Sequence, residues 1–525
     1  MRFSFSGQRG MRLALAVAAL SFLPQLSQAQ TYNWNGGNGA YGTAGNWSPS
    51  GPPTTASNVF INSGTANYTS GDTNPRSVNV ASTAGSSATL AITGGDIFAD
   101  QGNEGGVRIG EAGTGIVTVN NATLRTGDGS IFVGGQNGAG TGTLTLSGAF
   151  AKLQSTDDFV LGRTGTGTFN MQGGYATADY TVIGKYGTGT WNQSGGAFVQ
   201  TSGDFEIGDG GNQSPEQTGI VGPRTGTMNL TGGVLQSSGF IAISNRRGNG
   251  FVNVDGGVLA ATGVVNNGAI IVGRGMDWDG KPGTGGVTEF RVRGGNSVVI
   301  ANGDFEMNVN NVALSSTLVA QITGQAHTTI KVTGNAKIAN GSFKVQLDGY
   351  APVLGDSWTI LSAGVTDLSA EKNEIDLRLA AMGFPNLPHA TAGAVGTLQG
   401  EFKSTDFSLA PLSSGLQWDV AYANNSVVLS VVAGGPSYAA DFNHDGRVDG
   451  LDLTAWKTAY GQPSNGADAN GDGVTNGADF LVWQREFGSG VPATPAVSAV
   501  PEPASIALIG LAAMGLAAYG RARRS

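Results

Sequence analysis

Residues 142–147 read Gly-Thr-Leu-Thr-Leu-Ser, and residues 226–231 repeat the pattern as Gly-Thr-Met-Asn-Leu-Thr. Polar and apolar side chains alternate in both stretches, as they do in a β-strand that buries one face. The apolar residues around them show no helical periodicity. The two stretches therefore predict short strands, each of which needs a neighbour to cover its apolar face.

These strands belong to a repeat that fills the middle of the chain. Its most regular mark is an aliphatic residue followed by glycine, which recurs every 22 to 36 residues. The pairs are Ile109-Gly110, Val133-Gly134, Leu161-Gly162, Ile183-Gly184, Ile207-Gly208 and Val272-Gly273, with Ile243-Ser244 in the same slot. A period of this length indicates stacked units. Short strands joined by glycine-bearing turns predict a parallel β-solenoid, and thus a mainly β fold.

The composition agrees with this fold and excludes several others. Glycine supplies 87 of the 525 residues, and tight corners that need positive φ or close backbone approach would use them. Charged residues make up 12% and the net charge is −9, so we expect no nucleic-acid partner. Cysteine is absent, which excludes disulfides and thiolate sites. The three histidines are scattered, so none is a strong catalytic candidate.

Both ends of the chain carry targeting signals. Residues 1–29 run from a basic stretch through an 11-residue apolar run to Ser-Gln-Ala, the layout of a cleaved secretory signal peptide. At the other end Pro501, Glu502 and Pro503 precede 17 uncharged residues and a basic tail with Arg521, Arg523 and Arg524. The apolar run is at the lower limit for a transmembrane helix, and the arginines would stay on the cytoplasmic side.

This C-terminal order resembles the PEP-CTERM sorting signal of bacterial surface proteins. The resemblance implies an inner-membrane intermediate, processing by an exosortase-type enzyme, and release to the cell surface or extracellular matrix. An ordinary C-terminal membrane anchor is the alternative. We divide this end into a linker, residues 491–503, and a sorting helix with its basic tail, residues 504–525.

The repeats lie between two less regular regions. The start of the 30–303 segment contains Trp34 and Trp47, and its texture of Asn-Trp followed by Gly-rich repeats resembles the passengers of autotransporter-like surface proteins. We expect these aromatic residues to plug the end of the solenoid; carbohydrate contact is the alternative. In residues 304–435 the glycine density falls and longer β-patterned runs appear, around a short helix or loop at residues 371–382. We expect this region to be a β-rich cap.

The most specific chemistry lies in residues 436–490, where two loops share the ligand pattern of an EF-hand. Oxygen side chains occupy loop positions 1, 3, 5, 9 and 12, glycine occupies position 6, and position 7 offers a backbone carbonyl. The first loop uses Asp441, Asn443, Asp445, Arg447 (carbonyl), Asp449 and Asp452. The second, 27 residues later, uses Asp468, Asn470, Asp472, Val474 (carbonyl), Asn476 and Asp479. The pattern predicts two calcium ions.

A helix is expected after each loop, with apolar stripes at Leu453, Trp456 and Tyr460 and at Phe480, Trp483 and Phe487. Aspartate at position 12 and the lack of an entering helix make the segment similar to type I dockerins. The resemblance implies calcium-dependent docking onto a cohesin. Clostridial dockerins often carry hydroxyl residues at loop positions 10 and 11, whereas this chain has Gly450-Leu451 and Gly477-Ala478, so a cohesin-like or other surface protein remains the expected partner.

An enzymatic solenoid is the runner-up hypothesis. Asp158, Asp204 and Asp304 each precede a repeat's strand end by three residues, and Asp179 by four, so these carboxylates could stack at one corner. Only Arg163, Lys185 and Arg274 recur near them as basic partners. Aspartate is also a common turn residue before a strand, which favours a structural role. We therefore expect an exported structural or adhesive protein; the alternative is a dockerin-bearing protein that binds or degrades extracellular polysaccharide.

Overall fold

The structure is a computed structural model. It describes residues 29–55, 57–99, 106–136, 138–209, 224–245, 248–263, 269–274, 286–308, 315–383, 396–434, 438–443, 445–462 and 466–490. The described chain divides into two compact units. The first holds residues 29–352, 356–411 and 420–430, and the second holds residues 353–355, 412–419 and 431–490. Residues 1–28 of the expected signal peptide, the Pro-Glu-Pro motif and the C-terminal apolar run lie outside the described residues.

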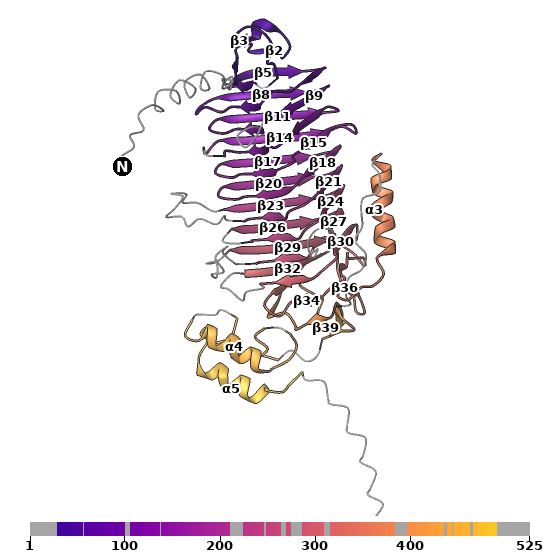
Figure 1. Ribbon diagram of the computed structural model, residues 1–525. Coiled ribbons are helices and arrows are strands. Elements are labelled where there is room, and N and C mark those ends of the chain that lie inside the picture. The colour runs from indigo at the N-terminus through magenta and orange to yellow at the C-terminus, as the bar shows by residue number, and fades with distance from the viewer. Residues whose placement is uncertain are drawn as a thin grey trace, which may run out of the picture. The chain divides into compact units, whose positions relative to one another are not determined.

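The first unit is a parallel β-solenoid, as the repeat predicts. Successive strands along the chain go to three sheets in turn, so each sheet gains one strand per coil. Figure 1 shows this stacking from β5 to β32. The repeats pair in register, and the glycine of each Thr-Gly-Thr stretch lies opposite the next, as Gly142 lies opposite Gly167. Sheets A, B and C have 14, 13 and 13 strands.

The strands of each sheet follow in their spatial order. Sheet A contains β3 (Trp47–Ser48), β1 (Thr31–Trp34), β4 (Asn58–Ile61), β7 (Ser77–Val80), β10 (Gly106–Ile109), β13 (Ser130–Val133), β16 (Asp158–Leu161), β19 (Tyr180–Ile183), β22 (Phe205–Ile207), β25 (Ile241–Ile243), β28 (Ile270–Val272), β31 (Phe305–Met307), β34 (Ala336–Lys337) and β37 (Leu398–Gln399). Sheet B contains β2 (Asn38–Ala40), β5 (Ser63–Tyr68), β8 (Ser87–Ile92), β11 (Thr114–Asn120), β14 (Thr141–Ser147), β17 (Thr166–Met171), β20 (Thr188–Gln193), β23 (Thr225–Leu230), β26 (Asn249–Val254), β29 (Val287–Arg293), β32 (Ser315–Ile322), β35 (Ser342–Leu347) and β38 (Ser404–Leu409). Sheet C contains β39 (Leu416–Ala423), β40 (Ser426–Ala433), β36 (Ser357–Ser362), β33 (Ile330–Val332), β30 (Ser297–Ala301), β27 (Gly257–Ala261), β24 (Val234–Ser237), β21 (Ala197–Gln200), β18 (Tyr175–Ala178), β15 (Lys152–Gln154), β12 (Thr123–Thr126), β9 (Asp96–Ala99) and β6 (Asp72–Thr73).

The inward faces of the three sheets form one continuous core. In its middle, Trp191 is fully buried and makes edge contacts with Phe169 and Phe198, with ring centroids 4.7 Å away in each case. Such aromatic pairs stabilise a core beyond the area that they bury. The alternating pattern that predicts the strands therefore also identifies the core side chains.

The glycine after each aliphatic residue turns the corner from sheet A to sheet B. Gly162 has φ +64°, and a Cβ placed there would lie 2.0 Å from the carbonyl oxygen of Thr188 in the next coil. At Gly162 the corner therefore needs a left-handed backbone, and the next coil leaves no room for a side chain there. Ser244 holds the same slot at φ +54°. Ala81 and Asn308 also occupy it, at φ +54° and +44°, although the sequence pattern did not identify them.

The N-terminal end of the solenoid is packed with aromatic side chains. Trp34 and Trp47 are 5% and 2% exposed, and their ring centroids lie 5.0 Å apart. Tyr41 also makes an edge contact with Trp47, with ring centroids 4.9 Å apart. Because these rings are buried, they support the capping interpretation over surface contact with carbohydrate.

The three sheets continue beyond residue 303. Strands β31 to β38 extend them in the region expected to be a separate β-rich cap, and antiparallel pairing first returns where β36 meets β40. The segment expected to be a short helix or a loop, residues 371–382, is helical: helix α3 spans Ser369–Ala381. The helix lies beside sheet C (Figure 1). Its residues Ile375 and Leu379, with the N-cap residue Leu368, belong to one hydrophobic cluster with the outward side chains Val234, Val258 and Ile300 of that sheet.

The second unit contains two short helices, α4 (Gly450–Ala459) and α5 (Gly477–Glu486), one after each acidic loop. Trp456 and Phe480 pack across the pair with ring centroids 5.0 Å apart. Tyr460 and Phe487, expected on the helical stripes, each lie one residue beyond the end of their helix and are more than half exposed. Their rings still pack on Trp456 and Trp483, with centroids 5.0 and 4.9 Å apart. Among the described residues, no helix is long and apolar enough to span a membrane.

Candidate metal centre

The first acidic loop is folded around the side chain of Asp441. Its two carboxylate oxygens accept hydrogen bonds from the backbone N–H groups of Asp445 and Gly446, at 3.0 and 2.7 Å. Gly446 has φ +82°, which lets the chain turn back toward Asp441. The local sequence therefore forms the tight turn that an EF-hand-type loop requires at position 6.

The residue at position 12 closes the loop onto the helix. Asp452 is fully buried and accepts hydrogen bonds from the N–H groups of Asn443 and Asp449, at 3.1 and 2.8 Å. Asp449 in turn accepts from the N–H of Leu451 at 2.7 Å, so positions 9 and 12 form a capping box at the start of α4. One carboxylate thus joins the loop to the helix.

The second loop repeats this geometry. Asp468 accepts from the N–H groups of Asp472 and Gly473 at 3.1 and 2.7 Å. Asp479 is fully buried and accepts from Asn470 and Asn476 at 3.0 and 2.8 Å. The second loop is more open, because Asn470 and Asp472 are exposed whereas Asn443 and Asp445 are half-buried.

Each loop is also bound by the helix that follows the other loop. The indole Nε1 of Trp456, on α4, donates to the carbonyl oxygen of Asn476 at 2.8 Å, and Trp483, on α5, donates to that of Asp449 at 2.9 Å. The residue at position 8 of each loop pairs with the segment after the opposite helix. These bonds join Val448 to Gly488 and Ser489, and Thr475 to Gly461 and Gln462. The two halves therefore interlock.

One further bond has no equivalent in the repeat. Glu486, on α5, accepts a hydrogen bond from the backbone N–H of Ala440 at 2.9 Å, just before the first loop. The corresponding position on α4 is Ala459, which has no carboxylate. The first loop is thus held at its beginning as well as at its end.

The electrostatics of the first loop favour a cation. Burial raises the pKa of Asp441 to about 6, and the charges of Asp445 and Asp452 act in the same direction. Burial also raises the pKa of Asp452. Carboxylates that are held together out of water repel each other unless a positive charge or a proton neutralises them.

The donor chemistry fits calcium, which prefers carboxylate, amide and carbonyl oxygens. The residues that would hold it are those predicted from the loop spacing. Asn443, Asn470 and Asn476 would offer amide oxygens, and Arg447 and Val474 would offer the carbonyls at position 7. Within the described ranges, no three Asp, Glu or His side chains gather closely enough to hold a metal by themselves. Bound calcium would supply the positive charge that offsets the repulsion between these carboxylates.

The solenoid does not stack its aspartates as one hypothesis required. In the register of sheet A, Tyr180 lies between Asp158 and Asp204, and the coils of Phe240 and Ala269 separate Asp204 from Asp304. Asp179 instead accepts a hydrogen bond from Thr201. Arg163 and Arg274 lie over the rings of Phe132 and Phe240, at 5.7 and 5.1 Å. These residues form no row of carboxylates on neighbouring coils.

Two acidic clusters lie at sheet A, and Asp304 is the member of them that the sequence pattern identified. Glu206 accepts hydrogen bonds from Tyr180 and Asn245, and it is 3% exposed, so this cluster is a buried structural network. The second cluster places the ammonium of Lys337 3.0 Å from Asp304 and 2.5 Å from Glu306. Glu306 and Lys337 line an open hollow of about 490 Å³ with Asn340 and Gln399. Hydrogen bonds to Glu306 and Asp304 raise the pKa of Lys337, so it stays protonated and cannot act as a base.

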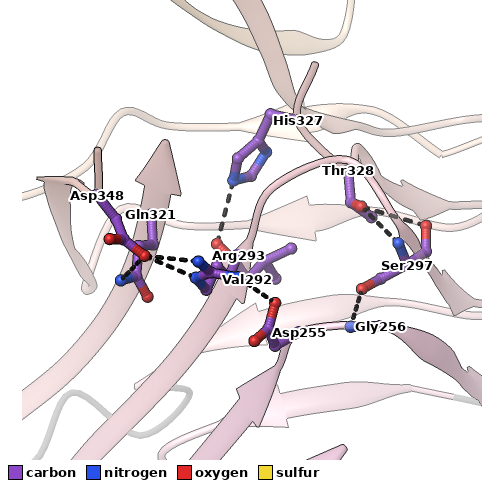
Figure 2. Close-up of polar contacts among 9 residues, drawn as sticks. All are labelled: Asp255, Gly256, Val292, Arg293, Ser297, Gln321, His327, Thr328 and Asp348. Atoms are coloured by element: carbon purple, nitrogen blue, oxygen red, sulfur yellow. Dashed lines mark hydrogen bonds and ion pairs between the residues drawn. The ribbon is translucent and has the colours of Figure 1, made fainter. Parts of the chain in front are cut away.

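His327, the histidine in the described part of the chain, has a structural environment. Burial lowers its pKa to about 4, and its Nε2 lies 3.1 Å from the carbonyl oxygen of Val292 (Figure 2). Beside it, Arg293 bridges Asp255 and Asp348 at 2.8 and 2.7 Å, which links separate coils (Figure 2). This group lies near the turn between β29 of sheet B and β30 of sheet C, and the contacts described for it are structural.

Comparisons with known proteins agree with the two specific motifs. Residues 439–487 match the dockerin type I domain, and residues 499–524 match the PEP-CTERM protein-sorting motif. Neither match covers the solenoid. No curated protein and no solved structure matches the chain. The domain and the motif together point to an exported surface protein, for which a cohesin partner and exosortase processing are implied.

Proposed function

We propose that the chain is a structural or adhesive protein of the cell surface or extracellular matrix, and that its C-terminal module binds two calcium ions and docks onto a cohesin-like or other surface protein. The observation that supports this most is the pair of matched loops. Both use the same hydrogen bonds around Asp441 and Asp468, and both bury their last aspartate. Two such loops beside a sorting motif have a simple interpretation: the solenoid is delivered to the surface and then held there.

The sorting step would use the C-terminal segment. Pro501, Glu502 and Pro503 would mark the processing site, and the apolar run at residues 504–520 would hold an inner-membrane intermediate with Arg521, Arg523 and Arg524 on the cytoplasmic side. Removal of the tail would release the mature protein. Truncation after Pro503 tests this step: we expect loss of surface retention with an unchanged protease resistance of the solenoid. Retention at full-length levels would place the anchor elsewhere.

The docking step is tested by pull-down from an outer-surface extract. We expect the exported protein to capture its partner in calcium and to lose it in chelator. The matched control is the double variant Asp441→Ala, Asp468→Ala, which keeps the solenoid and should capture nothing in either condition. Equal capture by the double variant would show that the acidic loops do not mediate docking.

A polysaccharide-degrading or polysaccharide-binding solenoid is the second candidate, and the hollow beside Glu306 and Lys337 favours it. Both carboxylates there form ion pairs with the same lysine, so the site has polar contacts for a sugar and holds both carboxylates in salt bridges instead of leaving them as a free acid–base pair. Binding is therefore the better interpretation of this hollow. Release of reducing sugar from extracellular polysaccharide, abolished by Glu306→Gln, would instead establish degradation.

A further inference from the structure

Sheet B presents a regular grid of hydroxyl groups on its outward face. Four consecutive strands, β14, β17, β20 and β23, carry Thr-Gly-Thr in register, with glycine turned inward and both threonines outward. The first column of the grid is Thr141, Thr166, Thr188 and Thr225, and the second is Thr143, Thr168, Thr190 and Thr227. Neighbouring strands of a sheet are about 4.8 Å apart, so the hydroxyls recur at that spacing.

A third column consists of asparagines whose amides form a ladder. Asn192 donates to the Oδ1 of Asn170 at 2.9 Å, Asn229 to Asn192 at 2.9 Å, and Asn253 to Asn229 at 2.8 Å. A primary amide has two N–H donors and an oxygen with two lone pairs. At Asn192 and Asn229 the ladder uses one N–H donor and one lone pair of the amide oxygen. Each of these side chains therefore keeps one N–H and one lone pair for a ligand.

This face is uncharged and open to solvent. The outward side chains of β8, β11, β14, β17, β20, β23 and β26 include no Asp, Glu, Lys or Arg, although the chain carries a net charge of −9. Charge returns at β29, where Glu289 and Arg291 pair at 2.5 Å. The grid threonines and asparagines are half-buried or exposed, and helix α3 packs on sheet C.

The geometry points to a polymeric ligand. The face is a run of sheet strands rather than a concave pocket, which is the usual site for a small molecule. Its lack of cationic groups makes it unsuited to an anionic polymer. It offers donors and acceptors that repeat once per coil, and a repeating ligand can add many weak contacts into firm binding. Among extracellular polymers, a neutral polysaccharide carries hydroxyl groups on every sugar unit, and each hydroxyl can both donate and accept a hydrogen bond.

We propose that the outward face of sheet B from β14 to β26 binds a neutral, extended polysaccharide. The inference rests on the proposed function, because an extracellular polymer is accessible only to an exported protein. The two can fail separately. Binding to the polymer needs neither the calcium loops nor the sorting tail, and a solenoid that binds nothing could still be exported and docked.

The test is co-sedimentation of the full chain, in calcium, with microcrystalline cellulose as the neutral polysaccharide. We expect the protein to sediment with cellulose and not to bind alginate, an anionic polysaccharide. The variant Thr143→Val, Thr168→Val, Thr190→Val, Thr227→Val removes one column of hydroxyls with almost no change of shape, and should bind at least about tenfold more weakly. The four serine substitutions at these positions keep the hydroxyls and should bind as the wild type does.

The matched control is Thr123→Val with Thr177→Val, which changes outward threonines of sheet C. It should bind cellulose as the wild type does. Circular dichroism and thermal unfolding verify that each variant is folded, and the serine variant supplies a second folded comparison. The proposal is overturned if the wild type fails to bind cellulose, if it binds alginate equally well, or if the valine column binds unchanged.

Discussion

Trp456 on helix α4 donates its indole N–H to the backbone carbonyl of Asn476, which lies at position 9 of the other loop, 2.8 Å away. Trp483 makes the reciprocal bond to Asp449. Each helix therefore stabilises the loop that precedes the other helix, and a substitution of either tryptophan should affect the opposite loop.

We expect Trp456→Phe to weaken calcium binding mainly at the second loop. The lost hydrogen bond corresponds to about 1 kcal/mol, or roughly a fivefold change in affinity. Calorimetric titration in the Asp441→Ala background, where only the second loop is intact, measures this effect. The mirror variant, Trp483→Phe with Asp468→Ala, should weaken the first loop similarly. An effect confined to the loop on the same side as each tryptophan would contradict the crossed arrangement.

The first loop should bind calcium more tightly than the second, by an order of magnitude or so. It offers four carboxylates where the second offers three, because Asn476 replaces the aspartate found at position 449. Its side chains are also less exposed. Titration of Asp468→Ala, which keeps the first loop, against Asp441→Ala, which keeps the second, gives the comparison directly. Stronger binding by Asp441→Ala would refute the ranking.

Calcium binding by the first loop should weaken as the pH falls below about 6. Burial raises the pKa of Asp441 in the folded, metal-free module to about 6, so protons compete with calcium there. The folding stability of the metal-free module changes with pH in the opposite direction. It declines as the pH rises from about 4 to about 6, because the folded state then loses a proton that the unfolded state has already lost. Titrations across this window, with Asp441→Asn as the control, should show a pH dependence that is weaker in the variant, where Asp452 is the remaining carboxylate with a raised pKa.

Gly162→Ala should destabilise the solenoid by about 3 kcal/mol or more. The new Cβ would meet the carbonyl oxygen of Thr188 at 2.0 Å, and the residue would have to keep φ +64°. Gly324→Ala is the control, since no atom lies within 4 Å of the point that its Cβ would occupy, and it should change stability by less than about 0.5 kcal/mol. Urea unfolding of both variants gives the answer; equal stabilities would mean that the coils can shift to make room.

His327 should make the solenoid sensitive to acid. The folded state lowers the pKa of this histidine to about 4, so the stability that comes from its neutral form is complete above about 6.5 and is lost as the pH falls toward 4. The loss approaches about 3 kcal/mol. In His327→Gln the urea midpoint should fall less steeply over this range. Parallel pH profiles for the two proteins would assign the acid sensitivity to other groups.

Much of this architecture can be predicted from local sequence. The alternation in residues 142–147 predicts the strand and its buried face, and the aliphatic-Gly pairs predict the corner. The spacing from Asp441 to Asp452 predicts a loop that closes onto a helix, because turn and cap chemistry act over a few residues. Each of these features depends on residues that are close together in the sequence, so the sequence of one chain is enough to predict it.

Contacts between coils were harder to predict. The separation of Asp158 from Asp204 by Tyr180 depends on the length of each repeat, and these lengths vary. Lys337 meets Glu306 across 31 residues, and Glu486 meets Ala440 across 46. The exposure of Tyr460 and Phe487 depends on where each helix stops, which the apolar spacing alone does not determine.

Helix α3 gives the solenoid a mechanical property that stacked repeats usually lack. In such arrays each coil contacts only its neighbours, so unfolding can begin at one end and advance one coil at a time. The helix lies across coils that include Val234, Val258 and Ile300, and it joins them to one rigid element. Under tension these coils should therefore unfold together in a single late event, after the coils nearer the N-terminus have already unfolded.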